Sequence, residues 1–274
     1  MGMDLLSQLN ETVQFLRARY SNKPSVGIVL GSGMGNFTDE IVIEEEIDYA
    51  DIPNFPLSTV EGHKGKLVFG KLTNKTVMVM AGRFHFYEGY TAQEIVFPIR
   101  VMKWLGVETV ILSNAAGAVN PSFNVGDLMI IKDHISLFTP NPLIGKNFEE
   151  IGPRFPDMSE PYKRSLIQQA KAIAEKNGIR LKEGVYVSVA GPTFETTAEY
   201  NLISVIGADA VGMSTVQECI AAKHIGMNVF GISIITDLAV REVNNLITHE
   251  EVLKAAKETE PKLALLFREL VDAI

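Results

Sequence analysis

Short apolar runs alternate with amphipathic segments of helix length along the whole of this chain. The apolar runs are rich in β-branched residues and almost free of polar ones, which is typical of strands buried on both faces of a sheet. They predict strands at Val26–Leu30, Thr76–Ala81, Thr109–Ser113, Leu128–Asp133, Val185–Ala190 and Val229–Thr236. The amphipathic segments predict helices at Asp4–Tyr20, Thr91–Leu105, Glu160–Asn177, Thr197–Ile206, Ser214–Ile225 and Thr248–Leu270. This alternation indicates one α/β domain over residues 1–274, with a central mixed or largely parallel β-sheet flanked by helices.

Local signals refine the limits of these elements. Pro98 and Pro261 fall within two of the predicted helices and should kink or split them. The stretch Asp39–Asp51 carries seven acidic residues and no basic one, which favours a solvated edge or loop. A hydroxyl residue followed three positions later by Glu or Gln is typical of a capping box at a helix start. Such pairs are Thr91 with Glu94, Ser214 with Gln217, and Thr248 with Glu251.

Charge and cysteine content exclude several classes of function. The formal net charge is −8, so nonspecific binding to nucleic acid or to a membrane surface is not expected. The single cysteine, Cys219, rules out an intrachain disulfide and a multi-cysteine metal cage, and it fits a reducing, cytoplasmic location. The N-terminal sequence lacks the pattern of a signal peptide. No apolar run of about 18 residues predicts a membrane span.

Two of the predicted strands end in residues suited to binding phosphate. The first runs into a Gly-Ser-Gly turn at 31–33, where backbone N–H groups and the Ser32 hydroxyl can face an anion. Asn36 stands where the dinucleotide-binding fingerprint needs a third glycine, and a plain tight turn is an equal alternative. After the second strand, Arg83 and His85 point to the same side, and Arg83 offers a bidentate fork for phosphate oxygens. A surface arginine beside a packed histidine is the structural alternative.

Two more strand ends add donors of the same kind. Small residues around Asn114 and Ala115 let a ligand approach the backbone, although close packing would explain them equally. Ser214 lies at a predicted helix start, where its hydroxyl can bind an anion or simply cap the helix. Ligands of open α/β sheets bind at the carboxyl ends of strands. These strand ends together predict one phosphate-type site, with His63 as a further donor from a loop.

Neither a metal centre nor a serine nucleophile is predicted. The five histidines, at positions 63, 85, 134, 224 and 249, never adopt the close spacing of a metal-binding motif such as HExxH. A Gly-x-Ser-x-Gly elbow, which presents the nucleophile of many serine hydrolases, does not occur in the sequence. The strand-end donors are all of a type that binds phosphate, and none of them belongs to a metal cage.

Several motifs, in order along the chain, resemble those of the trimeric, low-molecular-mass class of purine nucleoside phosphorylases. They are Gly31-Ser32-Gly33, Glu61-Gly62-His63, Gly82-Arg83-Phe84-His85, Tyr87-Glu88-Gly89-Tyr90, Asn114-Ala115-Ala116-Gly117, Arg154-Phe155-Pro156-Asp157-Met158-Ser159, Gly191-Pro192-Thr193-Phe194-Glu195-Thr196, Gly207-Ala208-Asp209-Ala210-Val211-Gly212-Met213-Ser214-Thr215 and His249-Glu250-Glu251-Val252. The resemblance covers about residues 26–253 and implies the nucleoside phosphorylase fold.

The resemblance implies a reaction in which a purine nucleoside and inorganic phosphate give free purine and ribose 1-phosphate. Phosphate is the nucleophile and a co-substrate, so the resemblance implies no cofactor and no metal. Cleavage of the N-glycosidic bond puts positive charge on the sugar and negative charge on the departing base, as in glycoside chemistry generally. The expected partners are the nucleoside, phosphate and two further copies of the chain in a homotrimer.

The resemblance also assigns roles to residues. Phe155 would come from a neighbouring chain to cover the sugar, and Asp237, His85, Glu195 and His249 would be catalytic. The phosphate-binding residues would be Ser32, His63, Arg83, His85, Asn114, Ala115 and Ser214. The nucleoside-binding residues would be Tyr87, Phe155, Phe194, Glu195, Val211, Gly212, Met213, Asp237 and His249.

Asp237 departs from the family pattern, which usually has Asn at this position. Asn serves a 6-oxopurine, whereas an ionised Asp only accepts hydrogen bonds and suits a 6-amino group, and a protonated Asp could donate to purine N7. Glu195 favours 6-oxopurines, because its carboxylate can accept hydrogen bonds from the N1–H and 2-amino groups that inosine and guanosine present. We expect inosine and guanosine as substrates.

Three other functions compete with this one. The alternative within the family is a phosphorylase for 6-aminopurine nucleosides such as adenosine or methylthioadenosine. A noncatalytic nucleoside or phosphate sensor is disfavoured by the full set of reactive-site donors. A dinucleotide-dependent dehydrogenase is disfavoured by Asn36.

Overall fold

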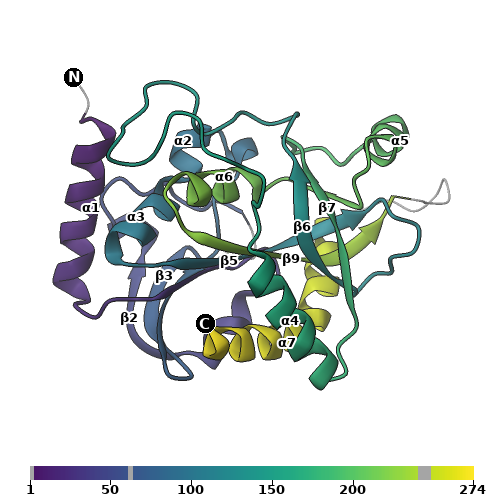
Figure 1. Cartoon of the computed structure of the whole chain (residues 1–274), viewed down its shortest axis with the longest axis horizontal. Helices are drawn as coiled ribbons and strands as arrows, with labels where there is room; N and C mark the ends of the chain where they lie inside the picture. Colours follow the sequence, from purple (N-terminus) through teal and green to yellow (C-terminus); the bar gives the residue numbers. More distant parts are fainter. Residues whose placement is uncertain (1–2, 61–63, 240–247) are drawn as a thin grey trace.

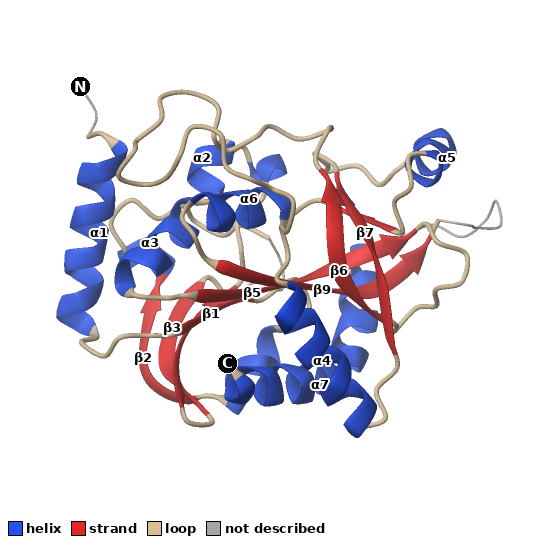
Figure 2. Ribbon diagram, in the orientation of Figure 1, coloured by secondary structure: helices blue, strands red, loops and turns tan. Residues whose placement is uncertain are grey.

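A nine-stranded mixed sheet forms the centre of the computed structural model, which describes residues 3–60, 64–239 and 248–274. In spatial order its strands are β2 (Val42–Asp48), β3 (Lys66–Leu72), β4 (Lys75–Ala81), β1 (Val26–Val29), β5 (Thr109–Ala118), β8 (Ala210–Gly212), β7 (Leu181–Ser188), β6 (Leu128–Ile135) and β9 (Asn228–Leu238). Helices flank this sheet (Figure 2). The predicted α/β fold with a mixed, helix-flanked sheet is confirmed.

The strand β5 connects two parts of the sheet: the strands β2, β3, β4 and β1 on one side of it, and the strands β8, β7, β6 and β9 on the other. β9 pairs with β5 as well as with β6, so β5, β8, β7, β6 and β9 form a closed ring. β9 runs along one edge of β5 over Thr109–Ala118. The other edge is taken first by β1, which pairs with residues 109–112, and later by β8, which pairs with Gly117 and Ala118. Residues 113–116 lie between these two pairings.

The helices lie on both sides of the sheet (Figure 1). On one side α1 (Leu5–Arg19) packs on α3 (Phe97–Leu105), and α3 packs on α6 (Val216–His224). On the other side α4 (Arg164–Lys176) packs on α7 (His249–Ala273), which also contacts β9. The described residues also form the helices α2 (Ala92–Ile95) and α5 (Thr197–Val205), and 3-10 turns at Gly35–Glu40, Tyr49–Asp51 and Phe86–Glu88.

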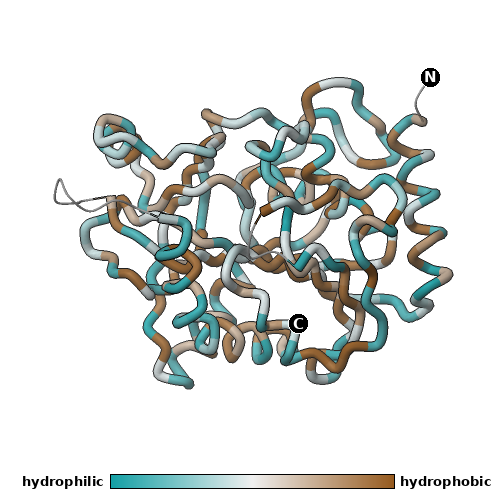
Figure 3. Tube along the Cα trace, turned by 180° about the vertical axis from the view of Figure 1, so that it is seen from behind, coloured by the Kyte–Doolittle hydropathy of each residue, from teal (hydrophilic) through white to brown (hydrophobic). Residues whose placement is uncertain are grey.

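The core follows the apolar runs of the sequence. All four residues of β1 are buried, as are the first four of β6. Strands at the centre of the molecule are mostly apolar, whereas α1 alternates between polar and apolar residues (Figure 3). This is the pattern of a sheet covered on both faces by amphipathic helices. Among the described helices, none is both long and apolar enough to cross a membrane.

Three strands were not predicted, namely β2, β3 and β8. β2 lies in the acidic stretch and forms an edge of the sheet, with most of its residues exposed. The expectation of a solvated edge for that stretch is therefore confirmed, because charged side chains suit an edge strand. β3 contains Gly70, which interrupts its apolar run, and β8 is only three residues long.

The two prolines act differently from each other. The predicted helix Thr91–Leu105 is split, since α2 ends at Ile95 and α3 begins at Phe97 with Pro98 in its first turn. Pro261, by contrast, lies inside the continuous helix α7, so of the two expected effects, a kink or a split, the split does not occur there. The predicted helix at Glu160 begins only at Arg164, because the Glu160 side chain instead accepts from the Arg164 N–H at 3.0 Å.

Two of the three predicted capping boxes are confirmed, and the third is wrong. Thr91 with Glu94 and Thr248 with Glu251 make both reciprocal contacts. Ser214 does not cap a helix. The first residue before α6 is Thr215, whose φ is 75° and whose side chain makes no capping bond. Its neighbour Ser214 is free to serve another partner, as the next subsection describes.

Candidate active site

A cavity of about 330 Å³ opens where residues 113–116 of β5 lie between β1 and β8. The structure brings fourteen of the predicted site residues to its wall: Ser32, Arg83, His85, Tyr87, Asn114, Ala115, Phe194, Glu195, Val211, Gly212, Met213, Ser214, Asp237 and His249. Two predicted residues are not among them. His63 lies outside the described residues, and Phe155 lines a different hollow, beside Arg154.

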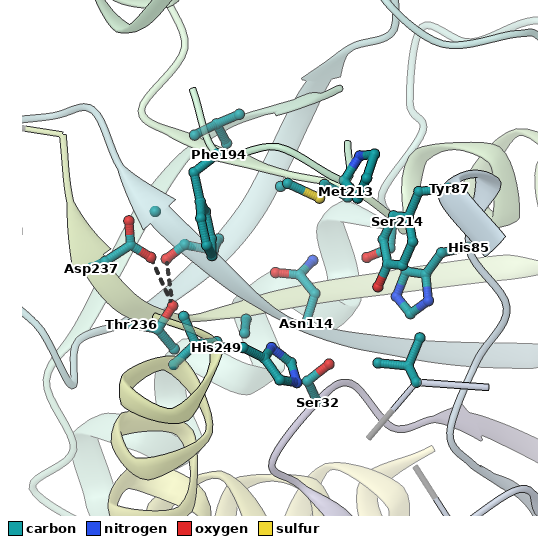
Figure 4. A pocket seen from close by; sticks show the side chains of 18 of the residues that line it. Ser32, His85, Tyr87, Asn114, Phe194, Met213, Ser214, Thr236, Asp237 and His249 are labelled. Atoms are coloured by element: carbon teal, nitrogen blue, oxygen red, sulfur yellow. Dashed lines mark hydrogen bonds between the residues drawn. The ribbon is translucent and has the colours of Figure 1, made fainter. Parts of the chain in front are cut away.

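The Gly-Ser-Gly turn lies directly against β5. The Gly31 N–H donates to the Ser113 hydroxyl at 3.3 Å, and that hydroxyl donates to the Val29 carbonyl at 3.0 Å. A Cβ at position 31 would lie 2.7 Å from the Asn114 Cα, so only glycine permits this approach. The close fit brings Ser32 and Asn114 to the same cavity, as Figure 4 shows.

Arg83 lies in the cavity wall and is only 1% exposed. Its Nε donates to Glu218 Oε1 at 3.1 Å, and its Nη2 lies 3.0 Å from Glu218 Oε2. Its Nη1 donates to the Ser113 carbonyl at 2.5 Å and to the Ser214 hydroxyl at 3.2 Å. The alternative of a surface arginine is therefore wrong. The Nε–Nη2 edge of Arg83 faces Glu218, so a bidentate contact with phosphate would have to use the other edge of the guanidinium.

His85 is fixed by Glu88, a residue that the sequence analysis did not select. Glu88 Oε1 accepts from the His85 backbone N–H at 2.8 Å and lies 3.0 Å from His85 Nδ1. Glu88 Oε2 accepts from the Thr59 backbone at 2.9 Å and from its hydroxyl at 2.7 Å. Burial lowers the pKa of His85, although Glu88 opposes this. The lowered pKa favours the neutral imidazole, and the contact between Nδ1 and Glu88 fixes the orientation of the ring.

The opposite end of the cavity carries two carboxyl groups. Asp237 is 8% exposed, and its Oδ1 accepts from the Thr236 hydroxyl at 3.1 Å. A Cβ on Gly117 would lie 2.7 Å from Asp237 Oδ2, so this glycine makes room for the carboxylate. Burial raises the pKa of Glu195, and the charge of Asp237 adds to that increase. Two nearby carboxyls in a partly dry site can accept from, or share a proton with, a polar heterocycle.

The middle of the cavity is lined by less polar side chains. Figure 4 shows Phe194 near Asp237, His85 and Tyr87 at the far end beside Ser214, and Asn114 between the two ends. The Tyr87 ring stacks on the His85 ring, with centroids 4.7 Å apart. Burial raises the pKa of Tyr87 to about 12, so its hydroxyl keeps its proton at neutral pH and can donate.

His249 and Phe155 occupy exposed positions. His249 is the first residue of α7 and reaches the cavity beside Ser32 (Figure 4). Phe155 is 89% exposed, with the Arg154 guanidinium 5.9 Å from its ring centre. It covers nothing within its own chain's cavity.

Sequence reasoning missed Glu88, Glu218 and Thr236. Glu88 has a local signal, because it is the acidic residue three positions after His85, in the motif Tyr87-Glu88-Gly89-Tyr90. Glu218 has no local signal, because its partner Arg83 is 135 residues away in the chain. Across the described residues, no group of three or more His, Cys, Asp or Glu side chains could hold a metal ion.

Comparisons with known proteins agree on one family. The family model of the phosphorylase superfamily matches residues 25–272. Purine nucleoside phosphorylase 1 of Geobacillus stearothermophilus is 52% identical over 97% of this chain and 96% of its own length. Purine nucleoside phosphorylase of Rattus norvegicus is 47% identical over 96% of this chain and 93% of its own length.

Solved structures give the same result. The crystal structure of Schistosoma mansoni purine nucleoside phosphorylase in complex with adenosine has a TM-score of 0.93 and 40% identity, and covers 98% of both chains. A schistosoma purine nucleoside phosphorylase in complex with hypoxanthine has a TM-score of 0.92 and 38% identity, and covers 100% of this chain and 99% of that one.

Proposed function

This chain belongs to the purine nucleoside phosphorylases, pentosyltransferases of the phosphorylase superfamily, and from that premise we propose how its cavity carries out phosphorolysis. The observation that carries the proposal is the division of the cavity into two ends. Hydroxyl, imidazole and guanidinium donors lie at one end, and an aromatic ring with two carboxyls lies at the other. A volume of about 330 Å³ is in the range of small-molecule sites.

Phosphate binds at the donor end. Ser32, His85, Ser214 and the Ala115 backbone N–H surround it, with Arg83 in the wall behind Ser214. Neutral His85 accepts a hydrogen bond at Nε2 from the P–OH group of monohydrogen phosphate, which leaves the ionised oxygens facing the sugar. Fixing the nucleophile beside the anomeric carbon converts a bimolecular step into one within a complex, which lowers the barrier.

The nucleoside fills the rest of the cavity. The base packs against Phe194, and the ribose hydroxyls meet Tyr87, Met213 and His249. As the glycosidic bond breaks, negative charge develops on the purine, and a donor at N7 stabilises it. Asp237 in its protonated form is the group we assign to N7, with Thr236 fixing its carboxyl.

We propose inosine and guanosine as the preferred substrates. Glu195 supports this, because its carboxylate can accept from the N1–H and 2-amino groups that these nucleosides present. The second candidate is a preference for 6-aminopurine nucleosides, and Asp237 at the base end favours it. The structural relative from Schistosoma mansoni is described in complex with adenosine.

Base release from inosine, guanosine and adenosine, each with and without phosphate, tests both the proposed phosphorolysis and the proposed base preference. We expect release to require phosphate and to be faster with inosine and guanosine. Release at the same rate without phosphate would contradict phosphorolysis. Faster release from adenosine would favour the second candidate.

The active site is proposed to be shared within a homotrimer. Phe155 and Ile144 are both exposed and line the same hollow, and exposed apolar side chains that lie together suit an interface between subunits. In such an interface Phe155 would cover the sugar in a neighbouring chain. We also propose a cytoplasmic location, which the single, buried Cys219 fits.

A further inference from the structure

The only cationic side chain among the described residues lining the cavity, Arg83, is already matched by an internal anion. Glu218 lies in the first turn of α6, is 3% exposed, and contacts both Nε and Nη2 of Arg83 at 3.1 and 3.0 Å. The Nε–H donates a hydrogen bond to Glu218 Oε1, and Nη2 and Oε2 form an ion pair, so the carboxylate lies alongside the guanidinium. The first turn of a helix also favours a negative charge.

The surroundings of this pair exclude water. Arg83 and Glu218 have side chains that are 1% and 4% exposed. Burial raises the pKa of the adjacent Tyr49 well above its usual value and that of Tyr186 to about 12, and both tyrosines sense the two charges. In such a site, charges interact much more strongly than they do in water.

Phosphate therefore meets an arginine whose charge is already offset. The Ser214 hydroxyl lines the cavity and accepts a hydrogen bond from Arg83 Nη1 at 3.2 Å. The anion at this end would feel attraction from Arg83 and repulsion from Glu218 behind it. Neutral His85 adds a hydrogen-bonding group without a full charge.

We propose that Glu218 is an internal counter-ion that competes with phosphate for Arg83 and so limits the affinity of the site for phosphate. It acts through Arg83 and is a positioning residue, not a catalytic one. It stabilises the empty site by neutralising a buried cation, and the same charge weakens the hold on phosphate so that the ion exchanges during turnover. This inference rests on the proposed use of phosphate.

Glu218→Gln tests the proposal, because it removes the charge but keeps the size of the side chain. We expect the KM for phosphate to fall about tenfold, the change that about 1.4 kcal/mol produces, while the KM for inosine stays near its original value. The phosphate-free variant should melt several degrees lower, since one charge of a buried pair has lost its partner. Added phosphate should raise the melting temperature of the variant by more than it raises that of the parent protein.

Two matched variants separate charge from packing. Glu218→Asp keeps the charge, so its KM for phosphate should not fall. Glu260→Gln changes another buried glutamate, which accepts from the Phe37 N–H at 2.8 Å outside the cavity, and it should alter stability without changing the KM for phosphate. A fall in the KM for phosphate in either variant would contradict the charge argument.

A double-mutant cycle with Arg83→Met tests whether Glu218 acts through Arg83. In the Arg83→Met background, Glu218→Gln should no longer tighten phosphate binding. The proposal is overturned if the folded Glu218→Gln variant shows an unchanged or raised KM for phosphate, or if the tightening persists undiminished without Arg83. Should Glu218→Gln fail to fold alone, refolding at increasing phosphate concentration must rescue it.

The same series distinguishes failure of this inference from failure of the proposed function. If the parent protein releases base without needing phosphate, the proposed function is wrong. Calorimetric titration of parent and variant with inorganic phosphate then still measures the effect of Glu218. If the parent requires phosphate and Glu218→Gln leaves its affinity unchanged, only the inference is wrong.

Discussion

Replacing Glu88 by glutamine should disturb both stability and phosphate use. The Glu88 carboxylate accepts four hydrogen bonds, two from the backbone and ring of His85 and two from the backbone and hydroxyl of Thr59. An amide at this position has one oxygen and one NH₂ group, so two of the four donors would face another donor. His85 would lose its fixed orientation, and the chain around Thr59 would lose its anchor on the cavity wall.

The size of the effect follows from the pKa. Burial raises the pKa of Glu88, but the hydrogen bonds from His85 and Thr59 outweigh it and lower the pKa from 4.5 to about 2. A shift of this size corresponds to an upper value of about 3.4 kcal/mol. Screening by solvent reduces it to about 2 kcal/mol. For a chain of this length, that corresponds to a fall in Tm of roughly 4–8 °C.

The sign of the pH dependence is also determined. Because the pKa of Glu88 is lower in the folded state, its contribution is fully present above pH 4.5 and is lost as the pH falls toward 2. Denaturant unfolding of parent and Glu88→Gln proteins should therefore show the largest difference near neutral pH. At pH 3.5 about 40% of that difference should be gone.

Glu94→Gln is the matched control for this change. Glu94 accepts from the Thr91 N–H and hydroxyl, both at 2.7 Å, in the same three-residue spacing but at the exposed start of α2. It should cost less stability and leave the KM for phosphate unchanged, whereas Glu88→Gln should raise that KM. An equal stability gap at pH 3.5 and 7, or an unchanged KM for phosphate in Glu88→Gln, would refute the reasoning.

Asp237→Asn should retain or improve inosine cleavage and reduce adenosine cleavage, measured as relative rates near neutral pH, and equal losses on both nucleosides would count against a proton donor at N7. Gly31→Ala should destabilise the fold by about 1–3 kcal/mol in denaturant unfolding and raise the KM for phosphate, because its Cβ would meet the Asn114 backbone; a neutral result would mean that the turn adjusts. Phe155→Ala should leave monomer stability almost unchanged, because the side chain is exposed, but raise the KM for nucleoside. Sedimentation should show a trimer for the parent, and a fully active monomer at high dilution would contradict the shared site.

The elements that could be predicted are those with a strong local pattern. β1, β4, β5, β6 and β9 are apolar runs that would be buried in almost any α/β arrangement, and the sequence indicated each of them within a few residues of one end. Strand lengths were harder, because β5 continues through the small residues up to Ala118. Those residues carry little intrinsic strand preference, and pairing with β9 keeps them extended.

The site was predictable where one residue type has one common use. Glycines, hydroxyls, Arg83 and His85 at strand ends indicated an anion site before any three-dimensional information. The orientation of Arg83 could not be predicted, since it depends on Glu218 from a distant helix. The role of Ser214 could not be predicted either. A hydroxyl near a helix start can cap the helix or bind another group, and here the backbone angle of Thr215 directs Ser214 to Arg83.

The ring of strands through β5 has a consequence for biosynthesis. Its closure pairs Thr109 with Asn228 and Gly117 with Asp237. The β9 part of the cavity wall is therefore synthesised long after the β5 part. Pairings so distant in sequence form slowly. Until β9 emerges, one edge of β5 lacks the partner that it has in the finished sheet, and open strand edges of this kind recruit other chains. The nascent protein therefore has no complete site until β9, which carries Asp237, has been synthesised.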